Sequence, residues 1–371
     1  MTRKTKKVPD EREVRVENLV RTCYQSGGYV FAAKADLAAR KYGIQKMARL
    51  ASNENPRSPP ERAVERACKA ASRANRYPDQ TMQALTDTLS LYHGDYSFVT
   101  GVGMDGVIET IIRTVIDPGD SVVISNPTFS FYRLAARAQA ARIIEVPRGP
   151  DFLVDPDTFL REAEGAKLSF LCSPNNPTGT VTPETVIEEI LKEIDGLLFL
   201  DAAYVEFSDI DYRPLMRDYH NLVIGRTMSK VFGLAGVRVG YAFVPAWLVP
   251  FYQRAATPFT LNSLSAQAAI GALEDSTSFV AETIAHVREW RKRYLEEVPF
   301  PVFPSGANFV MVDVSPYSGD EMVSLLASQG VIVRSCASFP GLEDRYIRVS
   351  VGMDWENERF LSVMNWVQEQ G

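Results

Sequence analysis

Short apolar runs alternate with helical patterns through the middle of the chain, from about residue 95 to about residue 245. Apolar positions between residues 107 and 116 recur with the spacing of one helical face, and Pro118-Gly119 predicts where that helix ends. A second helix is predicted over Pro183–Ile194. Alternating strands and helices are typical of a largely parallel sheet covered by helices. The predicted strands are Ser121–Ser125, Arg142–Val146, Leu168–Leu171, Leu197–Leu200 and Asn221–Ile224.

The pattern changes after about residue 275, where a long charged helix is predicted over Ser276–Glu297. Beyond this helix, short apolar runs alternate with further helical patterns, which is typical of a smaller α+β domain. The predicted strands there are Asn308–Asp313, Val331–Arg334 and Tyr346–Ser350, with helices over Gly319–Ser328 and from Trp355 onward.

We therefore expect an α/β protein with two domains, which a chain of 371 residues with 46% hydrophobic content can form. The large domain is expected over residues 52–275, with a mostly parallel central sheet, and the small C-terminal domain over residues 276–371. Residues 16–51 are expected to pack with the small domain, and residues 1–15 to form a flexible tail.

Charge and composition argue against several classes of function. The 40 basic and 46 acidic residues give a net charge of −6, which argues against a nucleic-acid partner. No apolar run is long enough to span a membrane. The basic residues near the start are interrupted by Asp10, Glu11 and Glu13, which argues against a transit peptide.

The cysteines and histidines also argue against several kinds of site. The cysteines form no CxxC pair, so we expect reduced thiols and a cytoplasmic protein. The histidines lack metal-ligand spacing, so no metal site is predicted, and a Ser-His-Asp triad has few candidates. These residues are Cys23, Cys68, Cys172, Cys336, His93, His220 and His286.

The segment from Arg226 to Gly240 carries the strongest chemical signal in the chain. It places Lys230 beside the hydroxyls of Thr227 and Ser229 on one side and a glycine-rich turn with Arg238 on the other. A buried lysine shifts its pKa readily, and Schiff-base chemistry needs such an amine. The hydroxyls and the guanidinium are donors for a phosphate. One lysine beside one phosphate site suggests pyridoxal 5′-phosphate as the cofactor.

Other predicted strand ends offer partners for the ring of that cofactor. The strand Leu197–Leu200 is followed by Asp201, which can hold a pyridine nitrogen protonated, and Tyr204 can donate to a phenolate oxygen. Asn176, in a loop fixed by prolines and Gly179, can point its amide at a ligand. Phe129 can stack on a flat ring. Each segment alone also fits an ordinary turn, cap or core role; together with the lysine segment they favour a cofactor site.

The turn from Gly101 to Gly106 offers a second anion site, because backbone N–H groups at a helix start can hold a phosphate. Gly103, Met104 and Asp105 lie at its centre. The string also matches the GxGxxG pattern, so a nicotinamide oxidoreductase is the rival hypothesis. That hypothesis needs an acid at the end of the next strand, which instead ends in Asn126-Pro127.

Arg348 lies inside a short apolar strand, where an arginine is unexpected unless it binds an anion. A structural ion pair is the alternative interpretation, and Arg334 raises the same two possibilities.

Taken together, these residues resemble the histidinol-phosphate aminotransferase family, within the fold-type-I pyridoxal-phosphate aminotransferases. The similarity runs from about Tyr29 to the C-terminus. The motifs that carry it are Leu50–Pro56, Tyr77–Asp79, Pro127–Phe129, Pro174–Gly179, Asp201–Tyr204, Arg226–Gly240, Pro304–Phe309 and Arg348–Gly352.

The resemblance implies a role for each of these residues. Lys230 would form the covalent link to the cofactor and move the proton during transamination. Asp201 would pair with the ring nitrogen, Tyr204 and Asn176 would bond the phenolic oxygen, and Phe129 would stack on the ring. The phosphate would be held by Thr227, Ser229, Arg238, Gly103, Met104 and Asp105.

The resemblance also implies a homodimer, in which Tyr77 reaches the neighbouring active site. Arg348 would bind the carboxylate of glutamate and, in turn, the phosphate of the other substrate. Arg334, Asn55 and Tyr29 would complete the substrate pocket, with Tyr24 as a less well placed alternative to Tyr29.

Three positions depart from the family pattern. Ala202 replaces a glutamate, and Met104-Asp105-Gly106 replaces Ser-Asp-Glu, so the phosphate there must rely on backbone N–H groups. Arg57-Ser-Pro-Pro60 replaces a Gly-Pro pair and adds a positive charge near the expected substrate mouth.

The sequence therefore predicts an aminotransferase that exchanges the amino group between histidinol phosphate and 2-oxoglutarate, in histidine biosynthesis. An aromatic amino-acid aminotransferase and a decarboxylase of an amino-acid phosphate, both on the same scaffold, remain open alternatives. A non-enzymatic binding protein is disfavoured by the joint presence of Lys230, Asp201, Tyr204 and Arg238.

Overall fold

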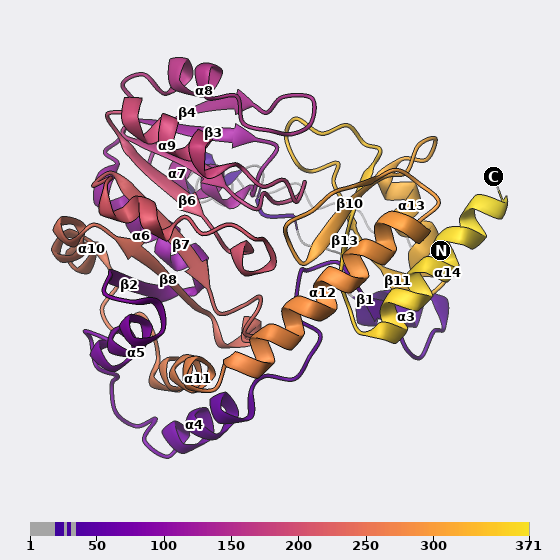
Figure 1. Cartoon of the computed structure of the whole chain (residues 1–371), viewed down its shortest axis with the longest axis horizontal. Helices are drawn as coiled ribbons and strands as arrows, with labels where there is room; N and C mark the ends of the chain where they lie inside the picture. Colours follow the sequence, from indigo (N-terminus) through magenta and orange to yellow (C-terminus); the bar gives the residue numbers. More distant parts are fainter. Residues whose placement is uncertain (1–18, 26–27, 31–34, 371) are drawn as a thin grey trace. The chain divides into compact units, whose positions relative to one another are not determined.

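A seven-stranded sheet forms the centre of the computed structural model (Figure 1), which describes residues 19–25, 28–30 and 35–370. Its strand order is β2-β8-β7-β6-β5-β3-β4. The pairs from β4 to β7 are parallel, and β8 is antiparallel to both of its neighbours. The mostly parallel sheet predicted from the sequence is therefore confirmed. The strands are β2 (Ser97–Val102), β3 (Ser121–Asn126), β4 (Arg142–Pro147), β5 (Leu168–Cys172), β6 (Leu197–Asp201), β7 (Leu222–Thr227) and β8 (Val239–Val244).

Every residue of β3, β5, β6, β7 and β8 is buried, as expected for strands covered on both faces. Helices α6 and α7 pack together, and so do α8 and α9. The helices around this sheet are α4 (Glu61–Ala71), α5 (Gln83–His93), α6 (Gly103–Val115), α7 (Phe131–Ala138), α8 (Pro156–Ala163), α9 (Glu184–Glu193), α10 (Val249–Ala255) and α11 (Ser263–Glu274), with short 3-10 turns η1 (Val205–Phe207), η2 (Arg213–Arg217), η3 (Ala235–Val237) and η4 (Ala246–Leu248).

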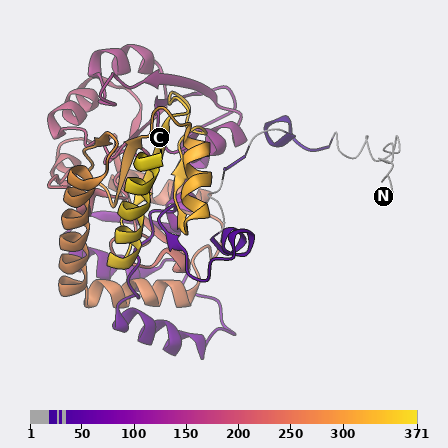
Figure 2. The ribbon, with the colours of Figure 1, turned by 90° about the vertical axis from the view of Figure 1, so that its right-hand side faces the viewer.

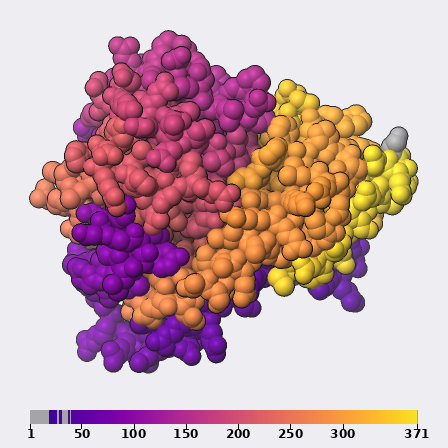
Figure 3. Space-filling view, in the orientation of Figure 1, coloured from indigo at the N-terminus to yellow at the C-terminus, as the bar shows by residue number. Residues whose placement is uncertain are grey.

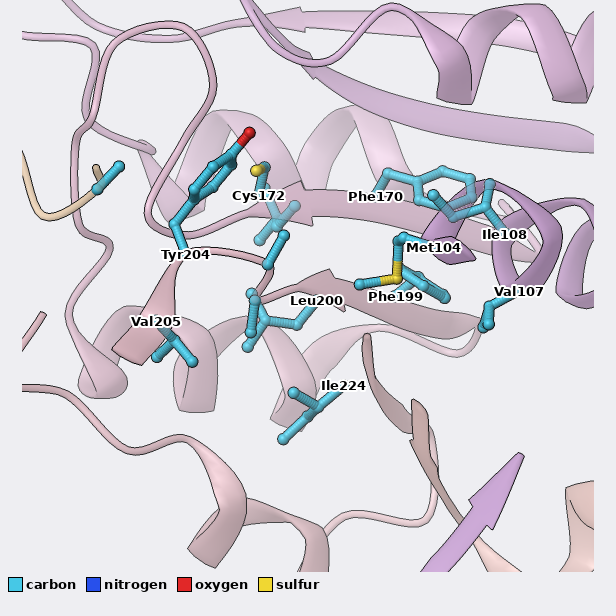
Figure 4. Close-up of a cluster of buried hydrophobic side chains, with 14 of the residues drawn as sticks. Met104, Val107, Ile108, Phe170, Cys172, Phe199, Leu200, Tyr204, Val205 and Ile224 are labelled. Carbon is cyan, nitrogen blue, oxygen red and sulfur yellow. The ribbon is translucent and has the colours of Figure 1, made fainter. Parts of the chain in front are cut away.

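Figure 4 shows how the core reaches the edge of the sheet that carries the predicted site residues. Met104 and Ile108 of α6 meet Phe170 and Phe199 of the sheet in one apolar cluster. Tyr204 stands at the end of this cluster, with its hydroxyl directed away from the apolar side chains. Apolar packing thus fixes the backbone while the polar tip remains available for a ligand.

The C-terminal part of the chain builds a four-stranded antiparallel sheet in the order β12-β13-β10-β9. Figure 2 shows its helices α12, α14 and α13 side by side. In Figure 3, the orange surface of the α12 segment crosses the visible face of the molecule. The elements are α12 (Thr277–Glu297), β9 (Val302–Phe303), β10 (Phe309–Asp313), α13 (Gly319–Ser328), β12 (Arg334–Ser335), β13 (Tyr346–Ser350) and α14 (Asp354–Gln370).

Two details differ from the sequence prediction. The single strand expected over Val331–Arg334 is two strands in different sheets, because β11 (Val331–Ile332) pairs with β1 (Ala48–Arg49) while β12 joins β13. Strands β2 and β8 were not predicted, since the short run of β8 was interpreted as part of the glycine-rich turn.

Residues 31–371 form one compact unit and residues 1–30 another. The second unit contains α2 (Thr22–Gln25), and α3 (Ala35–Tyr42) belongs to the first. The expected tail, residues 1–15, lies outside the described residues. Strand β1 pairs with β11. The packing expected for residues 16–51 and the domain boundaries at residues 52 and 275 stay predictions.

Candidate active site

The polar residues predicted from the sequence follow the carboxyl ends of three neighbouring parallel strands. In the sheet register, Cys172 of β5, Asp201 of β6 and Gly225 of β7 lie side by side. The loops that carry Asn176 and Lys230 therefore leave the sheet beside Asp201. This edge is where open α/β sheets bind their ligands.

The amine of Lys230 contacts a backbone carbonyl and lies over an aromatic ring. Its Nζ atom donates a hydrogen bond to the backbone oxygen of Asn53 at 3.0 Å and lies 5.3 Å from the centre of the Tyr204 ring. Burial and, to a smaller extent, the positive charge of Arg348 lower the pKa of Lys230 to about 8. About a tenth of this amine is therefore neutral at pH 7, and able to act as a nucleophile or base.

Asp201 is buried at the end of β6, and each of its carboxylate oxygens accepts one hydrogen bond. Tyr132 donates its hydroxyl to Oδ2 at 2.6 Å, and the backbone N–H of Ala203 donates to Oδ1 at 3.0 Å. Burial raises the pKa of Asp201 to about 6, although both hydrogen bonds oppose the rise. The carboxylate remains mostly ionised at pH 7, as a partner of a pyridinium nitrogen must be.

The Tyr204 hydroxyl accepts a hydrogen bond from the side-chain amide of Asn53 at 3.1 Å. Asn53 is buried in a left-handed backbone conformation, with φ 52°. Ser350, at the end of β13, bonds both the Asn53 N–H and its side-chain oxygen, at 2.9 and 3.0 Å. Asn53 thus connects the small sheet to both Lys230 and Tyr204.

The sequence predicts Asn55 as the pocket residue of this segment, but the structure brings Asn53 to the lysine. The Asn55 side chain donates to the Val231 carbonyl and accepts from the Arg57 N–H, each at 3.1 Å. These bonds stabilise the turn, and a substrate-binding role for Asn55 stays a prediction. No sequence signal separates the two asparagines, because the left-handed backbone of Asn53, a conformation that asparagine tolerates better than most residues, is visible only in the structure.

The predicted phosphate site gathers Arg238 and the first turn of α6. Arg238 forms an ion pair with Asp105 at 2.8 Å, and its carbonyl accepts the Gly103 N–H at 2.9 Å. The first N–H groups of a helix lack helical acceptors and favour an anion. Thr227 and Ser229 are buried nearby in sequence, and the Thr227 hydroxyl accepts the Ser229 N–H at 3.1 Å.

Gly103 shows why this cradle needs a residue without a side chain. Its φ is +66°, and a Cβ atom there would lie 2.4 Å from a guanidinium nitrogen of Arg238. Gly240 is equally constrained, since its Cβ would lie 2.3 Å from the Gly103 carbonyl carbon. The two glycines let β8, the Arg238 guanidinium and the start of α6 approach one another closely, as a shared phosphate cradle would require.

Arg348 reaches from β13 into the site of the large sheet. It donates to the Asn176 side-chain oxygen at 2.5 Å and to the Ala51 carbonyl at 2.7 Å. Its Nε atom is buried and has no hydrogen-bond partner among the described residues. A buried guanidinium with amide partners and an unsatisfied donor suits an anionic ligand. Arg334 pairs with β13 and donates to Ser338 at 3.0 Å.

Four other predicted residues have different surroundings. Phe129 meets Tyr132 edge-on, with ring centroids 5.6 Å apart. Tyr77 is 82% exposed and stacks on Phe259 at 4.6 Å. Tyr29, like Tyr24, belongs to the unit of residues 1–30, and its role in the substrate pocket stays a prediction.

Arg57, which the sequence places near the substrate mouth, is tied to α12. It pairs with Glu282 at 2.5 Å and lies over the ring of Phe279, 5.0 Å from its centre. The added charge is therefore matched by an acid of this chain.

Arg226 and Glu206 form a buried ion pair at 2.8 Å, which was not predicted from the sequence. It joins β7, which leads to Lys230, to the η1 turn, which follows Tyr204. Because both side chains are about nine-tenths buried, removing one partner would leave an uncompensated charge. The pair holds the two segments of the site in one arrangement.

The residues present fit pyridoxal 5′-phosphate. An amine of lowered pKa, a buried carboxylate and a cradle of glycine, arginine and helix N–H groups correspond to its aldehyde, ring nitrogen and phosphate. Among the described residues, no cluster of histidine, cysteine and acidic side chains could hold a metal ion. In the same part of the chain, no helix combines the length and apolar character needed to cross a bilayer.

Comparison with known proteins identifies the class. Residues 45–363 match the family described as aminotransferase class I and II, and the chain belongs to this family. It is 63% identical over 350 residues to the histidinol-phosphate aminotransferase of Methanoculleus marisnigri, covering 94% of this chain and 99% of the relative. It is 57% identical over 347 residues to the enzyme of that name from Methanocorpusculum labreanum, covering 93% and 98%.

A solved structure agrees with this result. The crystal structure of histidinol-phosphate aminotransferase from Sinorhizobium meliloti in complex with pyridoxal-5′-phosphate superimposes with a TM-score of 0.83 at 25% identity, covering 94% of this chain and 98% of that one. The Thermus thermophilus aspartate aminotransferase double mutant, with a TM-score of 0.80 and 23% identity over 93% and 99% of the chains, shares the fold.

Proposed function

We propose that this protein is a pyridoxal-phosphate-dependent aminotransferase that exchanges the amino group between histidinol phosphate and 2-oxoglutarate, a reaction of histidine biosynthesis. The observation that carries the proposal is the amine of Lys230, whose pKa is lowered to about 8 at the sheet edge where Asp201 ends β6. The name of the 63% identical relative supports the choice of substrate.

When bound, pyridoxal 5′-phosphate supplies an electron-withdrawing ring that accepts the electron pair released at the substrate carbon. Lys230 would hold the cofactor covalently through Nζ and, once released by the incoming amine, take up the proton from the amine-bearing carbon. Its lowered pKa serves both tasks, because each needs an unprotonated amine. The Asn53 carbonyl, at 3.0 Å, orients Nζ and accepts its proton in a hydrogen bond.

Asp201 would keep the ring nitrogen protonated through its carboxylate, and Tyr204 would donate to the phenolic oxygen. The Asn53 amide orients the Tyr204 hydroxyl by donating to its oxygen, which leaves the hydroxyl proton free for the ligand. Phe129 would cover one face of the ring. The phosphate would lie at the start of α6, held by Arg238, Thr227, Ser229 and the N–H groups of Gly103–Asp105.

Substrate anions would be bound by Arg348, with Arg334 on the neighbouring strand. Arg348 holds Asn176 at 2.5 Å, so one side chain connects the substrate side to the loop that carries a ring-binding residue. Its buried and unsatisfied Nε leaves capacity for one more acceptor. The same guanidinium would bind the carboxylate of glutamate and then the phosphate of histidinol phosphate. Asn55 and Tyr29 stay in the proposal as further pocket residues.

The proposal includes a homodimer, in which Tyr77 completes the site of the second copy. The 82% exposure of this tyrosine leaves its ring accessible to a second copy. A cytoplasmic location agrees with the four cysteines, which are all free.

The test begins with the absorption spectrum of the purified protein, followed by borohydride reduction and peptide mapping of the labelled lysine. We expect the label on Lys230. A label on any other lysine contradicts the assignment. A screen of amino donors then separates the substrates: histidinol phosphate should outcompete phenylalanine, tyrosine and aspartate, and no carbon dioxide should form. A preference for an aromatic amino acid, or release of carbon dioxide, would favour the alternatives on this scaffold.

A further inference from the structure

Tyr132, in the first turn of α7, makes the shortest contact to the carboxylate proposed to serve the cofactor ring. Its hydroxyl lies 2.6 Å from Oδ2 of Asp201, a distance typical of a strong hydrogen bond to an ionised oxygen. The other oxygen of Asp201 is bonded by the backbone of Ala203 at 3.0 Å. Tyr132 is therefore the side chain whose removal would most directly change the state of Asp201.

The packing around Tyr132 fixes the direction of this bond. The ring is fully buried and lies parallel to Phe170 of β5, with centroids 4.7 Å apart and planes 6° from parallel. Phe129 meets it edge-on at 5.6 Å and 82°. A ring held on two sides cannot swing its hydroxyl away from Asp201 without disturbing the core. Tyr132 thus contacts both the residue proposed to pair with the ring nitrogen and the residue proposed to stack on the ring.

The charged groups that face Asp201 do not by themselves keep it ionised. Burial raises the pKa of Asp201, and Asp105 at the start of α6 raises it further, while Lys230 lowers it. Burial, followed by the negative charge of Asp201, raises the pKa of the Tyr132 hydroxyl well above its ordinary value, so this hydroxyl stays a donor throughout the working pH range. A donor that cannot lose its proton stabilises the carboxylate over the neutral acid.

We propose that Tyr132 is a positioning residue that keeps the Asp201 carboxylate ionised and fixed, so that it can pair with a protonated ring nitrogen in the bound cofactor. The inference rests on the proposed function. The Tyr132 hydroxyl acts on the cofactor through Asp201, which pairs with the ring nitrogen. Its contribution to binding therefore depends on the presence of that nitrogen atom.

The test compares the binding of two compounds to the cofactor-free full-length protein: pyridoxal 5′-phosphate and its 1-deaza analogue, which has carbon in place of the ring nitrogen. The wild-type protein should prefer the natural compound. Tyr132→Phe should reduce this preference about tenfold, since a hydrogen bond to a charged group contributes roughly that much. The matched control is Tyr294→Phe, which removes another buried hydroxyl, bonded to Asn357 at 2.6 Å in the C-terminal part of the chain. It should leave the preference unchanged.

A second variant moves the effect in the opposite direction and covers the case in which Tyr132→Phe fails to fold. Incorporation of 3-fluorotyrosine in place of Tyr132 keeps the ring and the hydroxyl but makes a better donor, so the preference for pyridoxal 5′-phosphate should rise. Equal weakening of both compounds by Tyr132→Phe, or no response to the fluorinated residue, would overturn the role of Tyr132. A wild-type protein that binds neither compound would instead overturn the proposed function.

Discussion

The Nζ atom of Lys230 donates a hydrogen bond to the backbone oxygen of Asn53, 3.0 Å away. The two residues are far apart in the sequence, and Asn53 reaches the lysine because its backbone turns through a left-handed conformation. The same oxygen accepts a second bond from the side chain of Asn308 at 3.2 Å. The segment before α4 is thus part of the lysine's environment, and it connects the small sheet to the proposed chemistry.

The Asn53 side chain can be tested separately from its backbone. Asn53→Gly keeps the left-handed conformation, which glycine adopts freely, but removes the bonds to Tyr204 and Ser350. We expect kcat to fall by about tenfold or more, since the Tyr204 hydroxyl loses the donor that orients it. Asn55→Gly is the comparison, because its side chain bonds Val231 and Arg57 rather than Tyr204, so a loss from its proposed pocket role should appear in KM and not in kcat. Steady-state kinetics with an equal loss in both variants would contradict the distinction between the two asparagines.

The lowered pKa of Lys230 predicts a pH-dependent stability of the cofactor-free protein. The folded-state pKa is about 8 and the ordinary value 10.5, so between these values the unfolded chain binds a proton that the folded chain has lost. Stability attributable to this group therefore rises as the pH increases from about 8 to 10.5. Lys230→Met should raise the free energy of unfolding at pH 7 by about 1–3 kcal/mol, with the gain shrinking toward pH 10.

Urea unfolding at both pH values measures this effect. Lys167→Met is the control, because the hydrogen bond of Lys167 to Asp120 raises its pKa above 10.5, so stability from that pair is fully present at both pH values and the effect of this variant should be the same at each. Equal destabilisation of the cofactor-free protein by Lys230→Met at both pH values would mean that burial does not lower the pKa of the Lys230 amine. The loaded variant should also lose turnover and the covalent cofactor.

The parallel sheet could be predicted from the sequence because β6 is apolar up to its last residue, Asp201, and β5 is apolar apart from Ser169. The residues at the strand ends, Asp201 above all, follow from that topology. Tyr132 could not be predicted, since an aromatic in a helix's first turn is equally suited to the core. Its role depends on a 2.6 Å contact across 69 residues of sequence.

Asn53 and Arg57 show a second limit, which is the direction of side chains in irregular loops. Asn53 and Asn55 are two residues apart and chemically identical, and only the backbone conformation decides which one faces the lysine. Arg57 adds a charge that the sequence alone places near the substrate, whereas its neutralising partner, Glu282, lies more than 200 positions later. Pairings of this kind depend on tertiary packing, which local patterns do not contain.

The close approach of Gly103 to Arg238 predicts a specific loss of cofactor affinity. In Gly103→Ala, the new Cβ would lie 2.4 Å from the guanidinium and displace it. We expect the dissociation constant for pyridoxal 5′-phosphate to rise by at least about tenfold, since a phosphate contact to a charged donor is disturbed. Gly165→Ala is the control, because it has a similar φ of +68° but open space around the added atom.

Both glycine variants should lose similar stability from backbone strain, on the order of 1 kcal/mol. Thermal unfolding of the cofactor-free proteins measures that shared cost, and fluorescence titration measures the difference in affinity. An unchanged affinity in Gly103→Ala would mean that Arg238 can move aside and still bind the phosphate.

The two arginines near the substrate side should behave differently. Arg348 is buried, bonds Asn176 and Ala51, and has an unsatisfied Nε, whereas Arg57 is paired with Glu282 and Phe279 of α12. Arg348→Gln keeps a donor for the Ala51 carbonyl but removes the charge. We expect KM for both glutamate and histidinol phosphate to rise by about a hundredfold, because both anions would use this guanidinium.

Arg57→Gln should change either KM by less than about threefold, because exposed ion pairs contribute little and the charge is already matched by Glu282. The melting temperature of Arg57→Gln should be slightly lower than that of the wild-type protein, and this difference should become smaller in 0.5 M salt. Steady-state kinetics on both variants, with melting curves to establish that each is folded, gives the comparison. A large and selective rise in KM for histidinol phosphate in Arg57→Gln would place Arg57 in the pocket, and would mean that its pairing with α12 opens when the phosphate binds.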